Sequence, residues 1–281
     1  MKMPCNSSSS EPALAVIIST TGRQSLIDIS IPSVFYQSRT PDILYVVSDA
    51  DEVLSVSDIA VLKNANFRVK HIINMREKNL TGAMNTVFSE MLFDGFNPVR
   101  TFIAVLDDDD WWESDYLDSC YNAAMQSDSD WVVSGIIRHE SKGDSGNYLS
   151  IPETLSEKSF LIGNPHIQGS NLFVKFSQVL LAGGYDENLP STTDRDLCLR
   201  LLALGNIKIT TLKRHMVHHL AYGKGRLSEL GSEKKCLGLK RFYYKYMPFM
   251  DENDRKLFLD RAEIYFGCYP ERVPENNTVD R

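Results

Sequence analysis

Short apolar runs alternate with helically spaced apolar residues along the first half of the chain. The apolar runs are typical of buried strands and lie at residues 13–20, 42–49, 67–74 and 100–107. A helical pattern follows each run, at residues 25–37, 53–64, 81–93 and 113–126. Strands that alternate with helices in this way predict βαβ units around a mostly parallel sheet.

Three of these four predicted strands end in polar or acidic residues. Ligands of open α/β sheets bind in the crevice beyond the carboxyl ends of the strands. The acidic residues at the ends of the second and fourth runs, Asp49 and Asp107, therefore lie where this fold class predicts a ligand site.

The second half of the chain is less regular. It contains one further strand pattern at residues 131–138 and a polar, glycine-containing loop at residues 139–147. Helical patterns follow at residues 174–181, 194–204, 229–246 and 252–266. We therefore expect a disordered polar leader over residues 1–12, an α/β domain over residues 13–225 and a helical C-terminal extension over residues 226–281.

The composition is that of a globular protein with net negative charge. Hydrophobic residues make up 43% of the 281 residues, which excludes the disordered and fibrous classes. The formal net charge of −7 argues against a partner made of nucleic acid, whose phosphates require a basic protein face. The N-terminus lacks the apolar core of a signal peptide and no apolar run is long enough to span a bilayer, so we expect a soluble cytoplasmic protein.

Five cysteines are scattered along the sequence, at positions Cys5, Cys120, Cys198, Cys236 and Cys268. They form no CxxC pair and match no zinc-ligand spacing. We therefore expect isolated thiols in a reducing compartment.

Four consecutive aspartates, Asp107–Asp110, directly follow a predicted buried strand. Like charges placed side by side are unfavourable. Mg²⁺ and Mn²⁺ prefer carboxylate oxygens and keep positions open for substrate phosphates. Alternate residues of an extended segment share a face, so Asp107 and Asp109 would point the same way. The alternative is a solvated acidic turn at the N-terminus of the following helix.

Residues 106–112 (LDDDDWW) resemble the DXD region of family 2 glycosyltransferases of the GT-A fold. Other segments resemble further landmarks of that family in the same order: IISTTGR at 17–23, VVSDADE at 46–52, NLTGAMN at 79–85, GGYDE at 183–187 and DRDL at 194–197. The resemblance implies a Rossmann-like α/β fold with a mixed, mostly parallel central sheet flanked by helices. It also implies a nucleotide and metal half over residues 13–126 and an acceptor half over residues 127–225.

The resemblance implies transfer of a sugar from a nucleotide-sugar donor, by default a UDP-sugar, to an acceptor hydroxyl with inversion. The cofactor would be Mn²⁺ or Mg²⁺, and the acceptor a sugar, a glycan or a lipid-linked glycan. The residues that it assigns to donor binding are Ser19, Thr20, Thr21, Arg23, Asp49, Asn79, Gly82, Asn85, Asp107 and Asp108. The residues that it assigns to the metal are Asp107, Asp109 and His218.

Asp194 corresponds to the general base of the family, although Thr193 replaces the glutamate that usually precedes it. A positioned carboxylate takes the proton of an acceptor hydroxyl as the new glycosidic bond forms. The alternative is structural, because Thr192, Thr193 and Asp194 precede a helical pattern and such residues cap helix N-termini.

His215, His218 and His219 lie close together where many relatives place a histidine at the metal or diphosphate. In an extended segment His218 and His219 point in opposite directions, so at most one of them faces the site. We take His218 as the metal ligand, and the alternative is that these histidines are packed or surface residues.

The stretch at residues 234–250 mixes basic and aromatic residues. One interpretation is a weak contact with a membrane surface beside a lipid-linked acceptor. The other is a helix that packs its aromatic rings on the core and keeps its lysines in water.

Two other functions compete with the glycosyltransferase interpretation. A nucleotidyltransferase uses a related sheet and an acidic metal site, but it normally has a glycine-rich basic phosphate loop where this chain has Gly22 and Arg23. A degenerate, non-catalytic module that binds nucleotide-sugars would explain Thr21 and Thr193 at positions where the family has other residues. The intact aspartates argue against such a module.

Overall fold

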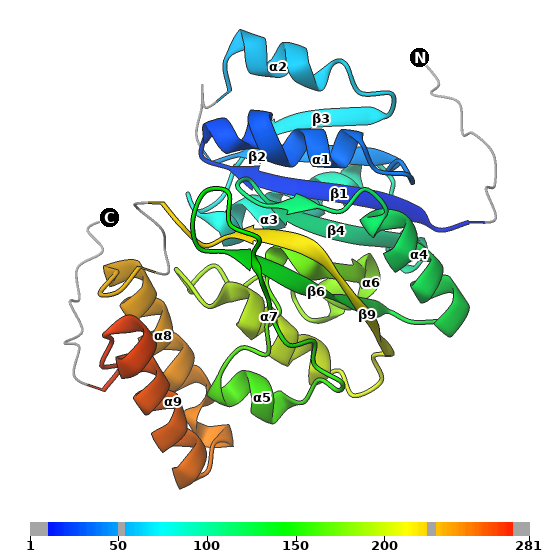
Figure 1. The fold of residues 1–281 in the computed structure, drawn as a ribbon. Helices are drawn as coiled ribbons and strands as arrows, with labels where there is room; N and C mark the ends of the chain where they lie inside the picture. Colours follow the sequence, from blue (N-terminus) through cyan, green and yellow to red (C-terminus); the bar gives the residue numbers. More distant parts are fainter. Residues whose placement is uncertain (1–10, 50–53, 224–228, 272–281) are drawn as a thin grey trace.

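The computed structural model describes residues 11–49, 54–223 and 229–271 (Figure 1). The strands are β1 (Ala13–Thr20), β2 (Ile43–Ser48), β3 (Arg68–Ile73), β4 (Thr101–Asp107), β5 (Trp111–Trp112), β6 (Trp131–His139), β7 (Asn147–Tyr148), β8 (Leu172–Lys175) and β9 (Ile209–Leu220). The helices are η1 (Leu26–Ser30), α1 (Ile31–Phe35), α2 (Val56–Leu62), α3 (Leu80–Phe93), η2 (Pro98–Arg100), α4 (Tyr116–Ser127), α5 (Glu157–Ile162), η3 (Gly169–Asn171), α6 (Phe176–Leu181), α7 (Thr193–Leu202), α8 (Glu233–Tyr246), η4 (Met247–Phe249) and α9 (Glu252–Phe266). Apart from its last two residues, the predicted leader at 1–12 lies outside the described residues.

One mixed sheet organises the described part of the chain, with the strand order β3-β2-β1-β4-β8-β6-β9-β5 and with β7 paired to β6. The strands β1 to β4 pair in parallel, as their βαβ pattern predicts. β8 is antiparallel to both β4 and β6, while β9 is parallel to β6 and antiparallel to β5. The predicted mixed sheet is confirmed, and its parallel pairings are concentrated in the first half of the chain.

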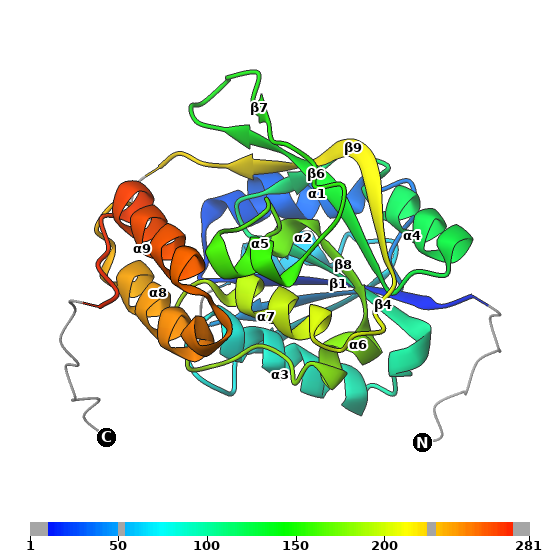
Figure 2. The same ribbon diagram turned by 90° about the horizontal axis from the view of Figure 1, so that it is seen from below.

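Helices cover both faces of this sheet (Figures 1 and 2). One core lies between the sheet and α3, α6 and α7, and the other lies between the sheet and α1 and α4. Strand β1 contributes to both, with Ala15 and Ile17 in the first core and Val16 and Ile18 in the second. A strand buried on both faces needs apolar side chains at successive positions, which explains its continuous apolar run.

Most predicted elements are confirmed to within a few residues, but the segment at 174–181 differs. Its first two residues end strand β8 rather than begin a helix. Val174 pairs with Ile103 of β4 on one side and with Trp131 of β6 on the other. Pairing with two strands that are distant in the sequence outweighs the local helical pattern there.

Strand β9 is the largest element that the apolar pattern does not indicate. It contains Lys213, Arg214 and three histidines, so no clean alternation of apolar and polar residues marks it. Its register with β6 defines it as a strand, and that register shifts near Gly135. Helix α5 is likewise not predicted.

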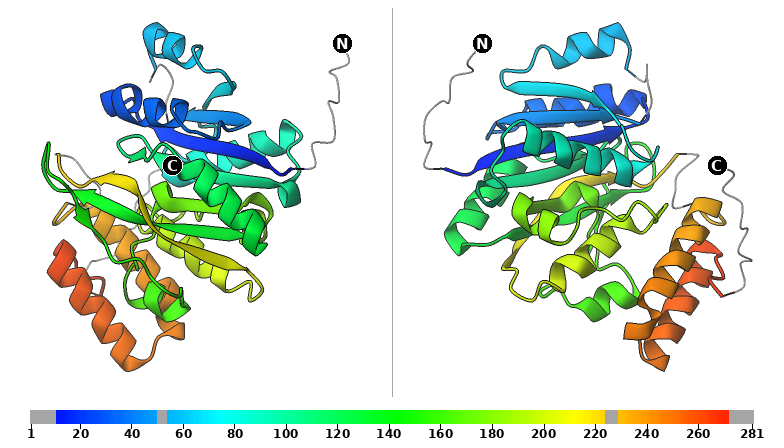
Figure 3. Two further views of the ribbon diagram at one scale, coloured as in Figure 1. Left: turned by 45° about the vertical axis from the view of Figure 1, so that its right-hand side comes forward. Right: turned by 180° about the vertical axis from the view of Figure 1, so that it is seen from behind.

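The helices α8 and α9 form a hairpin that packs against α5 at one end of the molecule (Figures 1 and 3). A disulfide joins Cys236 in the first turn of α8 to Cys268, two residues after the end of α9. The expectation of isolated thiols is therefore wrong for these two residues, because the hairpin brings together cysteines that are far apart in the sequence. Cys120 and Cys198 are free and buried, and Cys5 lies outside the described residues. Since disulfides persist mainly in oxidising environments, this bond counts against the predicted reducing compartment.

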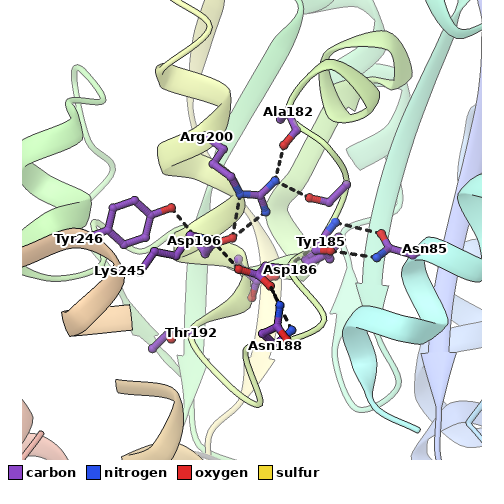
Figure 4. Close-up of polar contacts among 12 residues, drawn as sticks. Asn85, Ala182, Tyr185, Asp186, Asn188, Thr192, Asp196, Arg200, Lys245 and Tyr246 are labelled. Atoms are coloured by element: carbon purple, nitrogen blue, oxygen red, sulfur yellow. Dashed lines mark hydrogen bonds and ion pairs between the residues drawn. The ribbon is translucent and has the colours of Figure 1, made fainter. Parts of the chain in front are cut away.

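A buried network around Asp196 fastens α8 to α7 (Figure 4). The Asp196 side chain is 0% exposed and accepts hydrogen bonds from Tyr246 Oη at 2.7 Å and Lys245 Nζ at 2.6 Å, both from the end of α8. Arg200, one turn further along α7, donates to the same carboxylate at 2.9 and 2.6 Å. A buried carboxylate requires such partners to offset its desolvation.

Helix α8 packs most of its aromatic residues into the core. Phe242 is fully buried, and Tyr243 and Tyr246 are nearly so. This arrangement agrees with the packed-helix interpretation of residues 234–250, and contact with a membrane surface stays a prediction. Among the described residues, no helix has the length and apolar character needed to cross a bilayer.

Replacing Asp196 with alanine would leave Lys245 and Arg200 without a shared buried partner. Breaking one side of a buried ion network costs about 3–5 kcal/mol, and we expect the free energy of unfolding to fall by that order. Urea denaturation followed by circular dichroism measures it. Asp128→Asn, which removes an exposed ion pair with Lys208, is the control and should keep the wild-type urea midpoint. An unchanged midpoint in Asp196→Ala would contradict the role of the network.

Candidate active site

The four aspartates form a tight turn rather than an extended segment. Strand β4 ends at Asp107, and the backbone N–H of Asp110 donates to the carbonyl oxygen of Asp107 at 3.2 Å. The hydroxyl of Ser30 donates to the carbonyl oxygen of Asp110 at 2.8 Å and holds the turn against η1. The strand-like alternation predicted for Asp107 and Asp109 is therefore wrong, because the backbone turns between them.

Asp110 is the structural member of the four. Its side chain is 0% exposed and accepts hydrogen bonds from Ser170 Oγ at 2.6 Å and from the backbone N–H of Leu220 at 3.0 Å. The Nδ1 atom of His219 lies 3.1 Å from the same carboxylate. These partners belong to η3 and β9, so Asp110 ties the turn to two elements that are distant in the sequence.

Asp108 faces the loop that follows β1. Its carboxylate accepts hydrogen bonds from Thr20 Oγ1 at 2.7 Å and from the Arg23 guanidinium at 3.1 Å. Burial raises the pKa of Asp108, and the bonds from Thr20, Arg23 and the Thr21 backbone oppose that rise. Arg23 also forms an ion pair with Asp109, so one guanidinium compensates two carboxylates.

Asp107 and Asp109 keep the least compensated negative charge. Burial raises the pKa of Asp107, and the neighbouring carboxylates of Asp110 and Asp194 raise it further. Burial followed by the charge of Asp110 raises the pKa of Asp109 to about 6, against the opposing effect of Arg23. Two carboxyl groups that resist ionisation in one place indicate a site suited to positive charge.

A cavity of about 280 Å³ opens at the carboxyl ends of β1, β2 and β4, and we call it the aspartate cavity. It brings together most of the residues predicted to bind donor or metal: Ser19, Thr20, Thr21, Arg23, Asp49, Asp107, Asp108 and Asp109. The side chain of Asn74 donates to Asp49 Oδ1 at 2.7 Å and orients that carboxylate.

Three residues predicted to bind the donor are not among those that line the aspartate cavity, and each makes structural contacts. Asn79 caps α3 by accepting a hydrogen bond from the backbone N–H of Gly82 at 2.9 Å. Gly82 is buried so tightly that a Cβ there would overlap the preceding backbone. Asn85 exchanges two hydrogen bonds of 2.9 Å with the backbone of Tyr185 (Figure 4). The segment at 79–85 begins α3 and anchors the loop at 183–187. Within this segment, Leu80 lines the aspartate cavity.

His219, rather than the predicted His218, reaches the aspartate cavity. Strand β5 pairs with β9 so that Trp111 lies opposite His218, and the two rings stack with centroids 4.6 Å apart. The Nε2 atom of His218 lies 2.9 Å from Glu113 Oε1, away from the four aspartates. His215 bonds a backbone carbonyl oxygen. The candidate metal ligand is therefore corrected from His218 to His219, because neighbouring residues of a strand face opposite sides.

A second cavity, of about 310 Å³, adjoins the first. The predicted base Asp194 lines it from the first turn of α7, and we call it the Asp194 cavity. The two cavities share Leu80, Asp107 and Lys235 as lining residues. The aspartate turn and Asp194 therefore belong to one continuous site.

Burial raises the pKa of Asp194 to about 6, while the N–H of Gly169 and the hydroxyl of Tyr185 oppose this rise. Gly169 also packs closely on the aspartate turn, since a Cβ there would lie 3.1 Å from Asp107 Oδ1. The N-cap of α7 is Thr192, so the alternative of Asp194 as the cap does not hold. Asp194 is thus a half-buried carboxyl group that faces a cavity, as a general base must.

The Asp194 cavity also contains Gln168, Lys235 and Arg261, which the sequence does not single out. Lys235 belongs to the basic and aromatic stretch at 234–250. The helical pattern of that stretch predicts packing, but it does not identify which lysine points towards a site on another part of the chain.

The donor atoms at the aspartate cavity suit a hard divalent cation in part. Within the described ranges, no group of three or more His, Cys, Asp or Glu side chains is arranged to hold a metal ion. Asp107 and Asp109 nevertheless place carboxylate oxygens at the cavity, and a nearby cation would favour the ionised forms that burial disfavours. Since Mg²⁺ often binds through one or two carboxylates plus substrate phosphates, the pair fits a cation that is completed by a phosphate-bearing ligand.

Comparison with known proteins defines the class and then the family. The fold is similar to that of an S. aureus TarS fragment in complex with UDP-GlcNAc, with 15% identity, a TM-score of 0.63 and coverage of 90% of this chain and 73% of that one. It is also similar to the mannosyltransferase PcManGT from Pyrobaculum calidifontis in complex with GDP-Man and Mn²⁺, with 13% identity, a TM-score of 0.59 and coverage of 90% and 70%. The fold is therefore that of the GT-A glycosyltransferases, as predicted.

Residues 15–179 match the family described as Glycosyl transferase family 2. The chain belongs to this family and is a glycosyltransferase. Comparison with curated protein sequences finds no significant match.

Asp194 links the stability of the unliganded protein to pH. Its pKa of about 6 exceeds the value near 4 expected in an unfolded chain, so folding favours the protonated acid. This contribution to stability is fully present below about pH 4 and is lost as the pH rises through about 6. We expect Asp194→Asn to raise the free energy of unfolding at pH 8 by up to about 3 kcal/mol and to change it little at pH 4.

Urea denaturation at both pH values measures this effect, and the value at pH 4 controls for altered packing in Asp194→Asn. A stability difference that is the same at pH 4 and pH 8 would show that the Asp194 carboxyl group is not held in this way.

Proposed function

We propose that the protein is an inverting, metal-dependent glycosyltransferase that moves a sugar from a nucleotide-sugar to an acceptor hydroxyl. The observation that carries this proposal is the wall that the two cavities share at Leu80, Asp107 and Lys235. The aspartate cavity binds the donor and the Asp194 cavity binds the acceptor. The anomeric carbon then lies near the shared wall, between the leaving phosphate and the incoming hydroxyl.

Asp194 acts as the general base. The acceptor hydroxyl gives its proton to Asp194 as its oxygen bonds to the anomeric carbon. The bond from that carbon to the phosphate oxygen breaks, and its electron pair leaves with the nucleoside diphosphate. A single displacement of this kind inverts the anomeric centre. The pKa of about 6 supports the role, since the group is a stronger base than an ordinary aspartate and is still ionised at neutral pH.

The loop after β1 and the end of β2 bind the nucleotide. Arg23 and Thr20 lie on one side of the aspartate cavity, and Asp49, oriented by Asn74, offers acceptor oxygens for the base or ribose. The two similar structures contain UDP-GlcNAc and GDP-Man, which supports a nucleotide-sugar without selecting the nucleotide. A UDP-sugar stays the default, because the family favours it.

Asp107 and Asp109 hold a divalent cation, Mn²⁺ or Mg²⁺, with His219 as the histidine at the same cavity. When bound, the cation supplies positive charge that stabilises the leaving diphosphate. The raised pKa values of the two aspartates and the Mn²⁺ in the PcManGT complex support this assignment. Family membership favours this function over a nucleotidyltransferase, and a transfer assay separates it from a degenerate binding module.

The donor is identified by thermal shift with UDP-GlcNAc, GDP-Man and other nucleotide-sugars, each with and without Mn²⁺. We expect one donor to raise the melting temperature only when Mn²⁺ is present, because a ligand of the native state stabilises it. Asp109→Ala should abolish the shift by removing a metal ligand, and Asp128→Asn should preserve it as the control. Absence of a shift with every donor would count against the donor site.

Asp194→Asn should bind that donor with wild-type affinity and lose transfer, because the carboxylate acts on the acceptor. A general base contributes about 10²- to 10⁴-fold, so kcat should fall by that order. In the wild type, kcat/KM should rise with pH through about 6 as Asp194 ionises. Product formation with the identified donor measures both, and weakened donor binding in Asp194→Asn would contradict the placement of this residue on the acceptor side.

A further inference from the structure

The Asp194 cavity has more cationic than anionic side chains. Arg195, Lys235 and Arg261 line it, against the carboxyl groups of Asp107 and Asp194. Arg195 is nearly buried, Lys235 is half-buried and Arg261 is exposed. Positive charge is therefore built into the wall as well as presented at the surface of this cavity.

These three cations contact carbonyl oxygens and aromatic rings rather than carboxylates. The Arg195 guanidinium donates to two backbone carbonyl oxygens and lies 4.2 Å from the centroid of the Phe242 ring. Lys235 Nζ lies 4.4 Å from the centroid of the Phe266 ring, and the Arg261 guanidinium stacks on an aromatic ring of its own helix. Within the described part of the chain, no carboxylate forms an ion pair with any of the three.

The pKa values of the two more buried cations, Arg195 and Lys235, are lowered. Burial, followed by the charge of Arg261, lowers the pKa of Arg195 to about 9. Burial, followed by the charge of Arg195, lowers the pKa of Lys235 to about 8, while Asp194 opposes that change. An anion in the cavity would relieve both effects, because an opposite charge stabilises a buried cation.

An unsatisfied hydrogen-bond donor lies at the same cavity. The Nε2 atom of Gln168 is buried and has no hydrogen-bond partner among the described residues. Buried polar groups are rarely left unpaired, so this amide has an unused hydrogen-bond donor beside the cavity. It comes from the segment that also carries Gly169, whose N–H donates to Asp194.

We infer that the sugar acceptor carries an anionic group, a phosphate or a carboxylate, which Lys235, Arg261 and Gln168 bind while the acceptor hydroxyl lies at Asp194. The inference rests on the proposed function for the assignment of this cavity to the acceptor. Arg195 adds positive potential from within the wall. The volume of about 310 Å³ is in the range of sites for small molecules.

The donor diphosphate does not account for all of this positive charge. Arg261 and Gln168 line the Asp194 cavity and are not among the residues of the aspartate cavity, whereas Lys235 lines both. Arg23 belongs to the aspartate cavity alone. Arg261 and Arg23 therefore distinguish an anion bound beside Asp194 from a phosphate bound at the donor site.

Binding is tested with four probes on the full chain without donor or metal: inorganic phosphate, glucose 6-phosphate, glucuronate and unmodified glucose. Isothermal titration calorimetry at low ionic strength measures each affinity. We expect at least one of the anions to bind about tenfold or more tightly than glucose, because hydrogen bonds to charged groups are the stronger ones. A preference for the phosphates or for glucuronate identifies the anionic group.

Arg261→Gln and Lys235→Gln should each weaken anion binding by about tenfold or more, since each removes a charged partner. Lys256→Gln removes an exposed cation from the same helix as Arg261 and is the matched control. This control and Arg23→Gln should bind the anion as the wild type does, and circular dichroism confirms that each variant is folded.

The inference is overturned if no anion binds more tightly than glucose, or if anion binding survives in both Arg261→Gln and Lys235→Gln. It is also overturned if Arg23→Gln loses anion binding to the same extent as they do. Anion binding that follows Arg261 and Lys235, combined with a failure to transfer from any nucleotide-sugar, would support the anion site and count against the proposed function alone.

Discussion

The negative charge of four adjacent carboxylates at the end of β4 is the constraint that the surrounding structure satisfies. Partners from η3 and β9 compensate Asp110, and partners from the loop after β1 compensate Asp108. Asp107 and Asp109 line the aspartate cavity and have raised pKa values. The turn therefore connects several elements of the fold and also forms a place where positive charge is favourable. Both properties depend on the same backbone conformation.

The site has an opposite electrostatic character on its two sides. The aspartate turn concentrates negative charge, whereas Arg195 and Arg261 bring positive charge to the Asp194 cavity and Lys235 lines both cavities. Lys235 lies on the helical hairpin of the predicted C-terminal extension, and the Asp196 network holds that hairpin against α7. The proposed cation-bound diphosphate on one side and the proposed anionic acceptor on the other match this division of charge.

Patterns among residues that are close together in the sequence predicted much of the fold and of the candidate site. The apolar runs predicted β1 to β4, because a strand covered on both faces needs apolar residues at successive positions. The order of short motifs indicated the family, and most residues predicted to bind donor or metal line one cavity. The cluster at Asp107–Asp110 also marked the carboxyl end of a predicted strand, where this fold class places its ligand site.

Contacts between distant segments decided the rest. The pairing of β5 with β9 places His219, and not His218, beside the aspartates, and no local pattern encodes which face of β9 turns inward. Asn79 caps the N-terminus of α3, although its motif resembles a donor-binding segment of the family. Lys235 enters the site through the packing of α8 on α7. Local sequence fixes the propensity of a segment and the chemistry of its side chains, whereas the direction in which each side chain points depends on partners supplied from elsewhere in the chain.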